Sequence, residues 1–416
     1  MERLIFHVDV NSAFLSWEAV KRLKEGLPDL REIPSCIGGD PEKRTSIVLA
    51  KSIPAKKYGI QTGEALSTAL RKCPKLEVAP PDFRLYSHNS KAFKDICREF
   101  APVVEEFSID ECFLDMTGTG LIYPNPLQTA DEIRTRIKEE LGFTVNIGIA
   151  GNKLLAKMAS DFEKPDKIHT LFQDEITAKM WGLSVGELLY CGEATADKLK
   201  RAGIRTIGDL ANANLSFLQQ LVGEKAGKQL HDSANGIDES PVREHPEEAK
   251  GYSISTTLEE NVVGFEQAER ILIGLCDMVS THMRMEKKFA FCIGVSIRFT
   301  DFRNKSHQCS LEQATDVTSE IYAEAKKLLH EVWNGMTPLR LISVSLTNVT
   351  NDDTQQLSLF TQENQGRERE KKLDRTMDSI RERFGIDSIK RGTTLTGNDR
   401  IARKFKGNYD NKRKNQ

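Results

Sequence analysis

Apolar positions follow two different periods along the first 170 residues of the chain. Short apolar runs rich in Val, Ile and Phe predict buried strands at 3–9 and 44–50, and apolar residues at helical spacing predict a helix over 12–26. Residues 146–165 then predict a strand, a glycine turn and another helix. Because strands and helices alternate up to about residue 170, we expect an α/β or α+β core in this part of the chain.

The run FSIDECFLDM places Asp110 and Glu111 side by side among strand-forming residues. Neighbouring side chains of a regular strand point to opposite faces, so both carboxylates can reach one ligand only if the chain turns there. The flanking runs 102–107 and 112–116 predict two short strands, with residues 108–111 as the hairpin connection. Either a solvated acidic turn or a cation site fits this pair, since crowded carboxylates repel each other unless a cation lies between them.

A helical region follows, with two similar segments, 192–199 and 223–230, in which a glycine turn precedes a helix. Such a turn presents free backbone N–H groups at a helix N-terminus, where phosphate binds well. The length of 192–211 fits a helix-hairpin-helix element, and ordinary helix packing is the alternative.

Residues 251–350 change the pattern again. They predict strand, helix, strand, strand, helix and strand, which is the β-α-β-β-α-β order of a split βαβ fold. Alternating apolar residues in 293–299 indicate a sheet with one buried face, and the basic residues nearby predict that its other face contacts a phosphate backbone. These basic residues are Arg298, Arg303, Lys305 and His307.

Composition sets limits on this interpretation. A chain of 416 residues with 29% charged and 39% apolar residues is typical of a soluble protein with about three or four domains. We expect a cytoplasmic protein, because no segment approaches the ~20 apolar residues of a membrane span and no signal peptide precedes the first strand. The eight cysteines and eight histidines lack metal-binding spacings, so we expect reduced thiols and no zinc site.

Charge is distributed unevenly. The net charge is −2, but residues 361–416 contain 16 Lys and Arg against 9 Asp and Glu. This basic tail either binds an anion or is simply solvated.

The motifs FHVDVNSAF, SIDECFLDM and NKLLAKMASDFEKPD, together with the helix-hairpin-helix segment, resemble Y-family DNA polymerases of the DinB/UmuC type, the translesion group that includes bacterial DNA polymerase IV. The resemblance spans about residues 1–350 in the same order and spacing. It implies an α+β right-hand polymerase whose domains would be a palm at 1–11 and 77–168, fingers at 12–76, a helical thumb at 169–243, a split βαβ little finger at 251–350 and a tail at 351–416.

The resemblance implies a role for three carboxylates, Asp9, Asp110 and Glu111. They would hold two Mg²⁺ ions, which Mn²⁺ could replace, with the backbone carbonyl of Val10 as a further ligand. One ion would lower the pKa of the primer 3′-hydroxyl, and the other would neutralise the triphosphate. With Asp9 as a third carboxylate, a cation site is favoured over a solvated turn.

Other positions would contact the nucleotide. Phe14 aligns with the steric gate that excludes a 2′-hydroxyl, although a core position on its helix is the alternative. Lys164, before a proline, aligns with a triphosphate-binding lysine. The finger loop departs from the family, with Ile53 in place of a common Tyr and Lys56 in place of Arg, so only Lys56 is assigned to the triphosphate. Asn11 follows the UmuC-like DVN variant instead of the commoner Asp.

We expect primer-template DNA to contact the thumb and little finger through Gly192, Thr195, Arg298, Arg303 and Lys305. In the tail, QLSLF is similar to the peptide that binds the bacterial sliding clamp, through Gln356, Leu357, Leu359 and Phe360.

Beyond this peptide, apolar residues at helical spacing predict a short amphipathic helix that stops at Gly385, followed by about a dozen disordered residues. The apolar residues are Leu373, Met377, Ile380 and Phe384.

The expected function is therefore template-directed addition of deoxynucleotides to a primer 3′ end by a monomeric translesion polymerase with low fidelity and no proofreading. Two alternatives are a catalytically inactive polymerase-like scaffold recruited to the clamp and a palm-fold nucleotidyl cyclase. The three carboxylates disfavour the scaffold, and the helix-hairpin-helix segment and the clamp peptide disfavour the cyclase.

Overall fold

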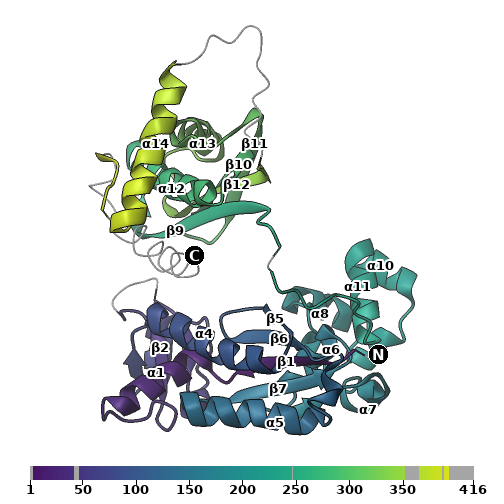
Figure 1. The fold of residues 1–416 in the computed structure, drawn as a ribbon. Helices are drawn as coiled ribbons and strands as arrows, with labels where there is room; N and C mark the ends of the chain where they lie inside the picture. Colours follow the sequence, from purple (N-terminus) through teal and green to yellow (C-terminus); the bar gives the residue numbers. More distant parts are fainter. Residues whose placement is uncertain (1–2, 42–45, 246, 352–364, 387, 393–416) are drawn as a thin grey trace. The chain divides into compact units, whose positions relative to one another are not determined.

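The computed structural model describes residues 3–41, 46–245, 247–351, 365–386 and 388–392 (Figure 1). The chain divides into two compact units, an N-terminal unit up to residue 246 and a C-terminal unit from residue 247. Each unit has its own apolar core. None of the helices in these described segments is long and apolar enough to cross a membrane.

A five-stranded sheet with β1 at its centre organises the N-terminal unit, in the order β5-β6-β1-β7-β8. Only the β7–β8 pair is parallel among these neighbours. All six residues of β1 are buried, as the apolar run predicted. The strands are β1 (Ile5–Val10), β5 (Val103–Glu106), β6 (Glu111–Asp115), β7 (Val145–Ala150) and β8 (Ile168–Thr170).

Helices cover both faces of this sheet. Phe6 and Val8 of β1 pack into the core formed with α4 (Phe83–Phe100) and α5 (Pro126–Arg136). Successive side chains of a strand point to opposite faces. His7 and Asp9 therefore point toward α6 (Lys153–Asp161), whose side chains contact both.

A smaller subdomain lies between β1 and α4 in sequence. Its three-stranded sheet has the order β3-β2-β4, and the strand expected from residue 44 begins only at Val48. Its elements are α1 (Ala13–Lys24), β2 (Ser35–Gly38), β3 (Val48–Lys51), α2 (Ile53–Lys56), α3 (Leu66–Lys72) and β4 (Glu77–Ala79).

The helical region after β8 has the expected glycine turns. Gly192 and Gly223 are the residues immediately before α8 and α11. Gly223 has φ +100°, which residues with a Cβ rarely adopt. The helices are α7 (Ile176–Lys179), α8 (Glu193–Arg201), α9 (Ile207–Ala211), α10 (Leu215–Val222) and α11 (Glu224–Ala234).

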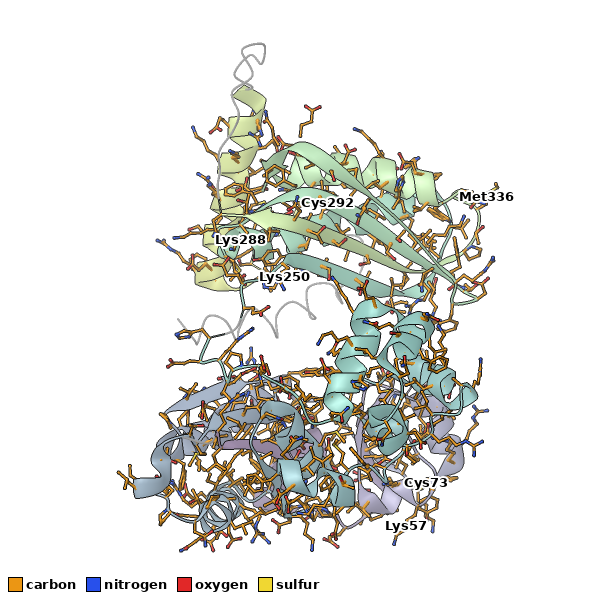
Figure 2. All side chains as sticks on the ribbon, turned by 90° about the vertical axis from the view of Figure 1, so that its right-hand side faces the viewer. Lys57, Cys73, Lys250, Lys288, Cys292 and Met336 are labelled. Atoms are coloured by element: carbon orange, nitrogen blue, oxygen red, sulfur yellow. The ribbon has the colours of Figure 1, made fainter. Side chains whose placement is uncertain are left out.

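The C-terminal unit confirms the predicted β-α-β-β-α-β order. Its four-stranded sheet has the order β11-β10-β12-β9, and α12 and α13 pack on one face of it (Figure 1). Figure 2 shows the side chains, with Lys288 just before β10 and Cys292 within it. The elements are β9 (Gly251–Val262), α12 (Phe265–Met285), β10 (Phe289–Phe299), β11 (Asn304–Thr315), α13 (Thr318–Val332) and β12 (Leu339–Thr350).

The expectation that the basic residues share one face of this sheet is wrong. Lys305 pairs with Ile297, and directly opposed residues of antiparallel strands point to the same face. Since Ile297 is in the core under the helices, Lys305 lies on the helix-covered side, as does His307, which contacts Glu331 of α13 at 2.6 Å. Arg298, one position along β10, points to the open face.

Small polar side chains dominate the open face instead. Their Cα partners run across β9, β12 and β10, so the hydroxyl groups form rows over the sheet. A surface of this kind can hydrogen-bond to a phosphate backbone at close range with few charges. The rows contain Ser253, Ser255, Thr257, Ser296, Ser343, Ser345 and Thr347, with Arg298 at one end.

The tail helix α14 (Gln365–Phe384) ends before Gly385, which has φ +95°, as predicted. Its expected apolar face is only partly correct. Met377 is buried, but Leu373 and Phe384 are 45% and 74% exposed. The last predicted residues of the tail, after 392, lie outside the described part of the chain.

Buried charges attach α14 to α12. Arg381 is 2% exposed and donates to Asp277 at 2.5 Å and to Thr281 at 2.9 Å. Arg284 of α12 contacts Asp378 of α14 at 2.6 Å. A pattern of apolar residues could not reveal these contacts, because they are made by charged side chains.

Candidate active site

Pairing of β1 with β6 brings two of the three predicted carboxylates together. Asp9 is the Cα partner of Glu111, so both side chains project from the same face of the sheet. Glu111 is therefore the first residue of β6, which corrects its expected place in the hairpin connection. Asp110 does lie in the connection, and its backbone carbonyl accepts a 3.0 Å hydrogen bond from Val10 N.

A lysine that the sequence interpretation missed lies between these two carboxylates. Lys157 Nζ is 3.0 Å from Asp9 Oδ2 and 2.5 Å from Glu111 Oε1. Lys164 Nζ also contacts Asp9 Oδ2, at 3.0 Å, and Asp161 Oδ1 at 2.8 Å. A signal for Lys157 was present, because it is a lone charge in the apolar run of α6 that faces the sheet.

His7 holds α6 against β1. Its Nδ1 is 2.8 Å from Ser160 Oγ, and Ser160 Oγ donates to the carbonyl of Lys157 at 2.8 Å. Since the hydroxyl has only one proton, Nδ1 of His7 must carry the proton in its own hydrogen bond. Burial lowers the pKa of His7 well below its usual value, so the ring is neutral. The ring thus fixes the part of α6 from which Lys157 projects.

Asp9 and Glu111 have opposite pKa shifts. Burial raises the pKa of Glu111 to about 7, and its hydrogen bond with Asp9 adds to the rise. Burial alone would also raise the pKa of Asp9, but the hydrogen bond with Glu111 and the ammonium groups of Lys164 and Lys157 lower it to about 2. The two carboxyl groups therefore titrate as a unit, and below about pH 7 the pair holds one shared proton.

The donor set fits a hard cation. In the described residues no group of three or more His, Cys, Asp or Glu side chains is arranged to hold a metal ion. Asp110 accepts a 2.7 Å hydrogen bond from Ser108 Oγ. Asp9 and Glu111 nevertheless bind one positive group, because the ammonium of Lys157 lies between their carboxylate oxygens. Carboxylate oxygens are also the ligands that Mg²⁺ prefers.

A cleft next to these acids contains the predicted nucleotide residues. It has a volume of about 420 Å³ and is lined by Phe14, Ile53, Lys56, Asp110 and Lys164, among others. Asp110 and Lys164 connect it to the acidic pair. The cleft lies wholly within the N-terminal unit.

Phe14 has one side in this cleft and the other in the aromatic core. Its ring stacks on Tyr86 with a centroid distance of 4.5 Å and an interplanar angle of 12°, and it meets the edge of Phe83 at 6.2 Å. The two interpretations of Phe14 are thus compatible, because packing on one side fixes the ring that the cleft exposes on the other.

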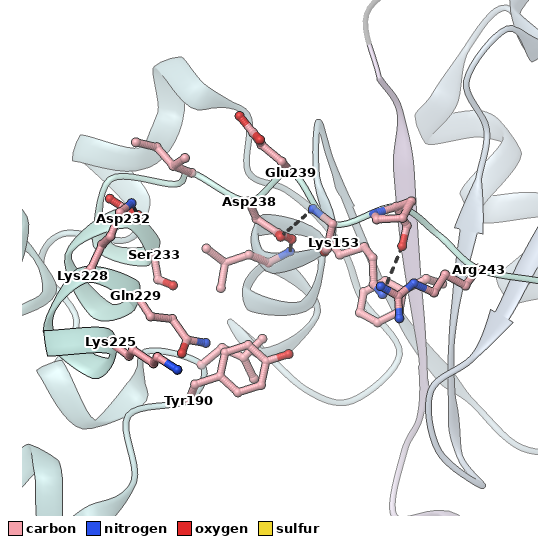
Figure 3. A pocket seen from close by; sticks show the side chains of 16 residues that line it. Lys153, Tyr190, Lys225, Lys228, Gln229, Asp232, Ser233, Asp238, Glu239 and Arg243 are labelled. Atoms are coloured by element: carbon pink, nitrogen blue, oxygen red, sulfur yellow. Dashed lines mark hydrogen bonds and ion pairs between the residues drawn. The ribbon is translucent and has the colours of Figure 1, made fainter. Parts of the chain in front are cut away.

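A second cavity, of about 670 Å³, lies between α6 and α11 (Figure 3). Tyr190, two residues before the N-cap Gly192, lines it with φ +70°, a strained conformation for a bulky residue. Four basic side chains reach the cavity, and acidic groups such as Asp232 pair with some of them. The basic residues are Lys153, Lys225, Lys228 and Arg243.

Comparison with known proteins identifies the family. The impB/mucB/samB family profile matches residues 8–161, the C-terminal domain of that family matches 249–359, and a thumb domain described as that of DNA polymerase-iota matches 191–238. The chain is 44% identical to DNA polymerase IV of Clostridium acetobutylicum, over 95% of this chain and 99% of that protein. It is 35% identical to DNA polymerase IV 1 of Bacillus subtilis, over 94% and 93%.

The chain belongs to the Y-family DNA polymerases. The solved structure of a Y-family DNA polymerase chimera matches it with a TM-score of 0.73, at 21% identity, over 84% of this chain and all of that one. This likeness confirms the right-hand fold. The exact division of the N-terminal unit into palm, fingers and thumb stays a prediction.

The remaining predicted residues of this Y-family chain lie elsewhere. Gly192 and Thr195 are at the N-terminus of α8 in the N-terminal unit. Arg298, Arg303 and Lys305 are in the C-terminal unit, where Arg303 pairs with Asp301 at 2.5 Å. The clamp-peptide residues 356–360 lie outside the described residues.

The shared proton predicts a pH effect on stability in the metal-free protein. Glu111 has a folded pKa of about 7 against an ordinary value of 4.5, so its stabilising contribution is complete below about pH 4.5 and is lost as the pH rises to 7. Glu111→Gln imitates the protonated acid. In EDTA, thermal unfolding should give similar Tm values for the two proteins near pH 4.5 and a higher Tm for the variant above pH 7. Parallel Tm–pH curves would refute the shared proton.

Proposed function

We propose that this Y-family chain extends a primer 3′ end on a DNA template by two-metal-ion catalysis. Membership of the family and its relatives named DNA polymerase IV support a translesion DNA polymerase that depends on divalent metal. Two-metal catalysis is supported most directly by the acidic pair Asp9–Glu111, which binds an ammonium group. The pair lies beside a cleft lined by Phe14 and Lys164, and Lys164 contacts Asp9. The inactive scaffold has no support, since all three carboxylates are present.

Asp9, Asp110 and Glu111, with the Val10 carbonyl, would hold two Mg²⁺ ions. When bound, these ions would activate the primer 3′-hydroxyl and stabilise the charge of the triphosphate and departing pyrophosphate. Ionised Asp9 and Glu111 are required for this, so the pair has to release its shared proton and Lys157 has to give up at least one carboxylate contact.

Side chains of the cleft would orient the nucleotide. Lys164 and Lys56 provide point charges for the triphosphate, and Ile53 offers only an apolar surface there. The rigid ring of Phe14 would lie under the sugar and collide with a 2′-hydroxyl. Holding the nucleotide against the acidic site supplies the proximity that catalysis requires.

The DNA path would use both units. Helix N-termini bind phosphate through free N–H groups, so Gly192 and Thr195 at α8 and the basic cavity beside them are proposed to hold the primer-template backbone. Arg298 and the hydroxyl rows of the open face would contact the backbone as well, with Arg303 and Lys305 at the edge of that sheet. We propose that the enzyme acts in the cytoplasm as a monomer.

Removal of a carboxylate should stop synthesis without loss of DNA binding. Asp110→Asn or Glu111→Ala should abolish Mg²⁺-dependent primer extension, because transition-state charge is no longer stabilised. Asp115→Asn, at the other end of β6, is the matched control and should keep its activity. Primer extension and DNA binding are measured on all three variants. Extension near the wild-type rate in Asp110→Asn would contradict the metal assignment.

Phe14→Ala should relax sugar selectivity. With the clash removed, ribonucleotide incorporation should increase relative to deoxynucleotide incorporation, as measured by extension with each nucleotide separately. Phe83→Ala, which removes a ring that touches Phe14 but does not line the cleft, is the control. An unchanged ratio in Phe14→Ala, or an equal change in the control, would assign Phe14 to the core alone.

Recruitment should depend on the clamp peptide and not on the active site. Residues 356–360 lie in sequence between β12 and α14, in the chain that follows the little finger. Leu357→Ala with Phe360→Ala should remove most of the affinity for a bacterial sliding clamp, at a cost on the order of 1 to 3 kcal/mol for each anchor. Synthesis should lose its stimulation by the clamp, because tethering raises the local concentration of enzyme, while clamp-free extension persists. Equal stimulation of mutant and wild type would show that QLSLF is only a solvated segment.

A further inference from the structure

The segment 163–167, which joins α6 to β8, carries Lys164 into the nucleotide cleft. Its lysine contacts Asp9 at 3.0 Å and Asp161 at 2.8 Å, but these flexible side-chain contacts do not by themselves fix the backbone. Two asparagines, one on β7 and one directly after β1, do fix it. Asn146 and Asn11 together bond to backbone atoms on both sides of Lys164.

Asn146 is fully buried on β7, and all its hydrogen-bonding positions are used. Its Nδ2 donates to the carbonyls of Ser160, at 3.0 Å, and Glu163, at 2.6 Å. Its Oδ1 accepts from Lys167 N at 3.3 Å and from Asn11 Nδ2 at 3.0 Å. Only an amide can donate twice and accept twice at this place. Asn146 thus ties the end of α6 to the start of β8.

Asn11 completes the connection from β1. It follows Val10, is 8% exposed and lines the cleft. Its Oδ1 accepts from Asp166 N and from Thr144 Oγ1, both at 2.9 Å, while its Nδ2 donates to Asn146. Asn11 therefore links the strand that carries Asp9 directly to the segment that carries Lys164.

The hydrogen bonds around position 11 require an amide side chain there, because it both accepts and donates. An aspartate has the same shape and could still accept from Asp166 N and Thr144 Oγ1, but it would place a carboxylate oxygen against Asn146 Oδ1. Asn146 cannot rotate its amide to compensate, because its Nδ2 already serves two backbone carbonyls. Two buried acceptors would then face each other without a proton between them, which is costly.

We propose that Asn11 and Asn146 are positioning residues that fix Lys164 relative to Asp9, and so determine the affinity for the nucleotide triphosphate. This inference rests on the proposed function. Neither asparagine needs to touch the nucleotide. Each acts through the backbone of residues 163–167, in the way that supporting hydrogen bonds hold a functional side chain within a fraction of an ångström of its working position.

The inference predicts a selective kinetic defect. Asn11→Asp should raise KM for the deoxynucleotide about tenfold with little change in kcat, and should weaken binding of a non-hydrolysable nucleotide triphosphate to the enzyme–DNA complex by a similar factor. A tenfold change equals about 1.4 kcal/mol, the scale of one buried hydrogen bond that is lost. Thr144→Val, which removes one donor to Asn11 and is less disruptive, should raise KM two- to threefold.

A double-mutant cycle separates positioning from general loss of structure. Lys164→Ala should itself raise KM, and Asn11→Asp or Thr144→Val should then have no further effect in that background, because their effect passes through Lys164. Asn152→Asp is the control. Asn152 is also a buried amide beside α6, and it donates to Gly236 O, but it does not contact residues 163–167. It should leave KM unchanged.

Three outcomes would overturn the inference. These are an unchanged KM in both Asn11→Asp and Thr144→Val, effects that add fully to that of Lys164→Ala, or an equal rise of KM in Asn152→Asp. Failure of the proposed function looks different, because the wild-type protein would then not extend a primer at all.

Discussion

Asp9 and Glu111 are neighbours across β1 and β6, and much of the N-terminal unit serves to keep these two carboxylates close together. Like charges in a poorly solvated site repel strongly, and each also loses hydration when it is buried. The ammonium of Lys157, between their oxygens, and the proton that the pair shares offset both costs. The arrangement requires α6 on this face of the sheet, and His7 with Ser160 holds the helix there.

The same arrangement explains the position of the nucleotide cleft. Asp9 belongs to β1 and Lys164 to the segment after α6, and Asn11 and Asn146 join the two through buried hydrogen bonds. Phe14 is the second residue of α1, the next helix along the chain, and it lines the same cleft. Asp9, Asn11 and Phe14, which supply a charge, a backbone anchor and an aromatic surface, thus all lie within a few residues of the end of β1.

Sequence could predict the residues of this site better than their contacts. Asp9, Asp110, Glu111, Phe14 and Lys164 stand in short motifs, and the structure places them around one cleft or beside it. The sequence motif could not show that Glu111 belongs to β6 and not to the turn. Its place depends on the register of β1 against β6, which pairs residues about a hundred positions apart. The lone charge of Lys157 in an apolar helix does signal a buried partner, but the sequence does not show that this partner is the Asp9–Glu111 pair.

Similar reasons account for the errors in the C-terminal unit. The order of its strands and helices follows from apolar periodicity, but the face on which Lys305 lies depends on its pairing with Ile297. The end of the tail helix at Gly385 was predicted correctly. Its attachment to α12 was not, because it includes the buried ion pair of Arg381 with Asp277, and the periodicity of apolar residues cannot show an ion pair. Long-range pairing and buried charge are therefore what the sequence leaves open here.

The acids bound by Lys157 are proposed to hold two divalent ions. Electron paramagnetic resonance of Mn²⁺ bound to the enzyme with primer-template DNA and a non-hydrolysable nucleotide tests this proposal directly. We expect two magnetically coupled Mn²⁺ ions per protein, as in other two-metal sites, and loss of this coupling in Asp9→Asn. Uncoupled ions, or binding that is the same in wild type and Asp9→Asn, would contradict it.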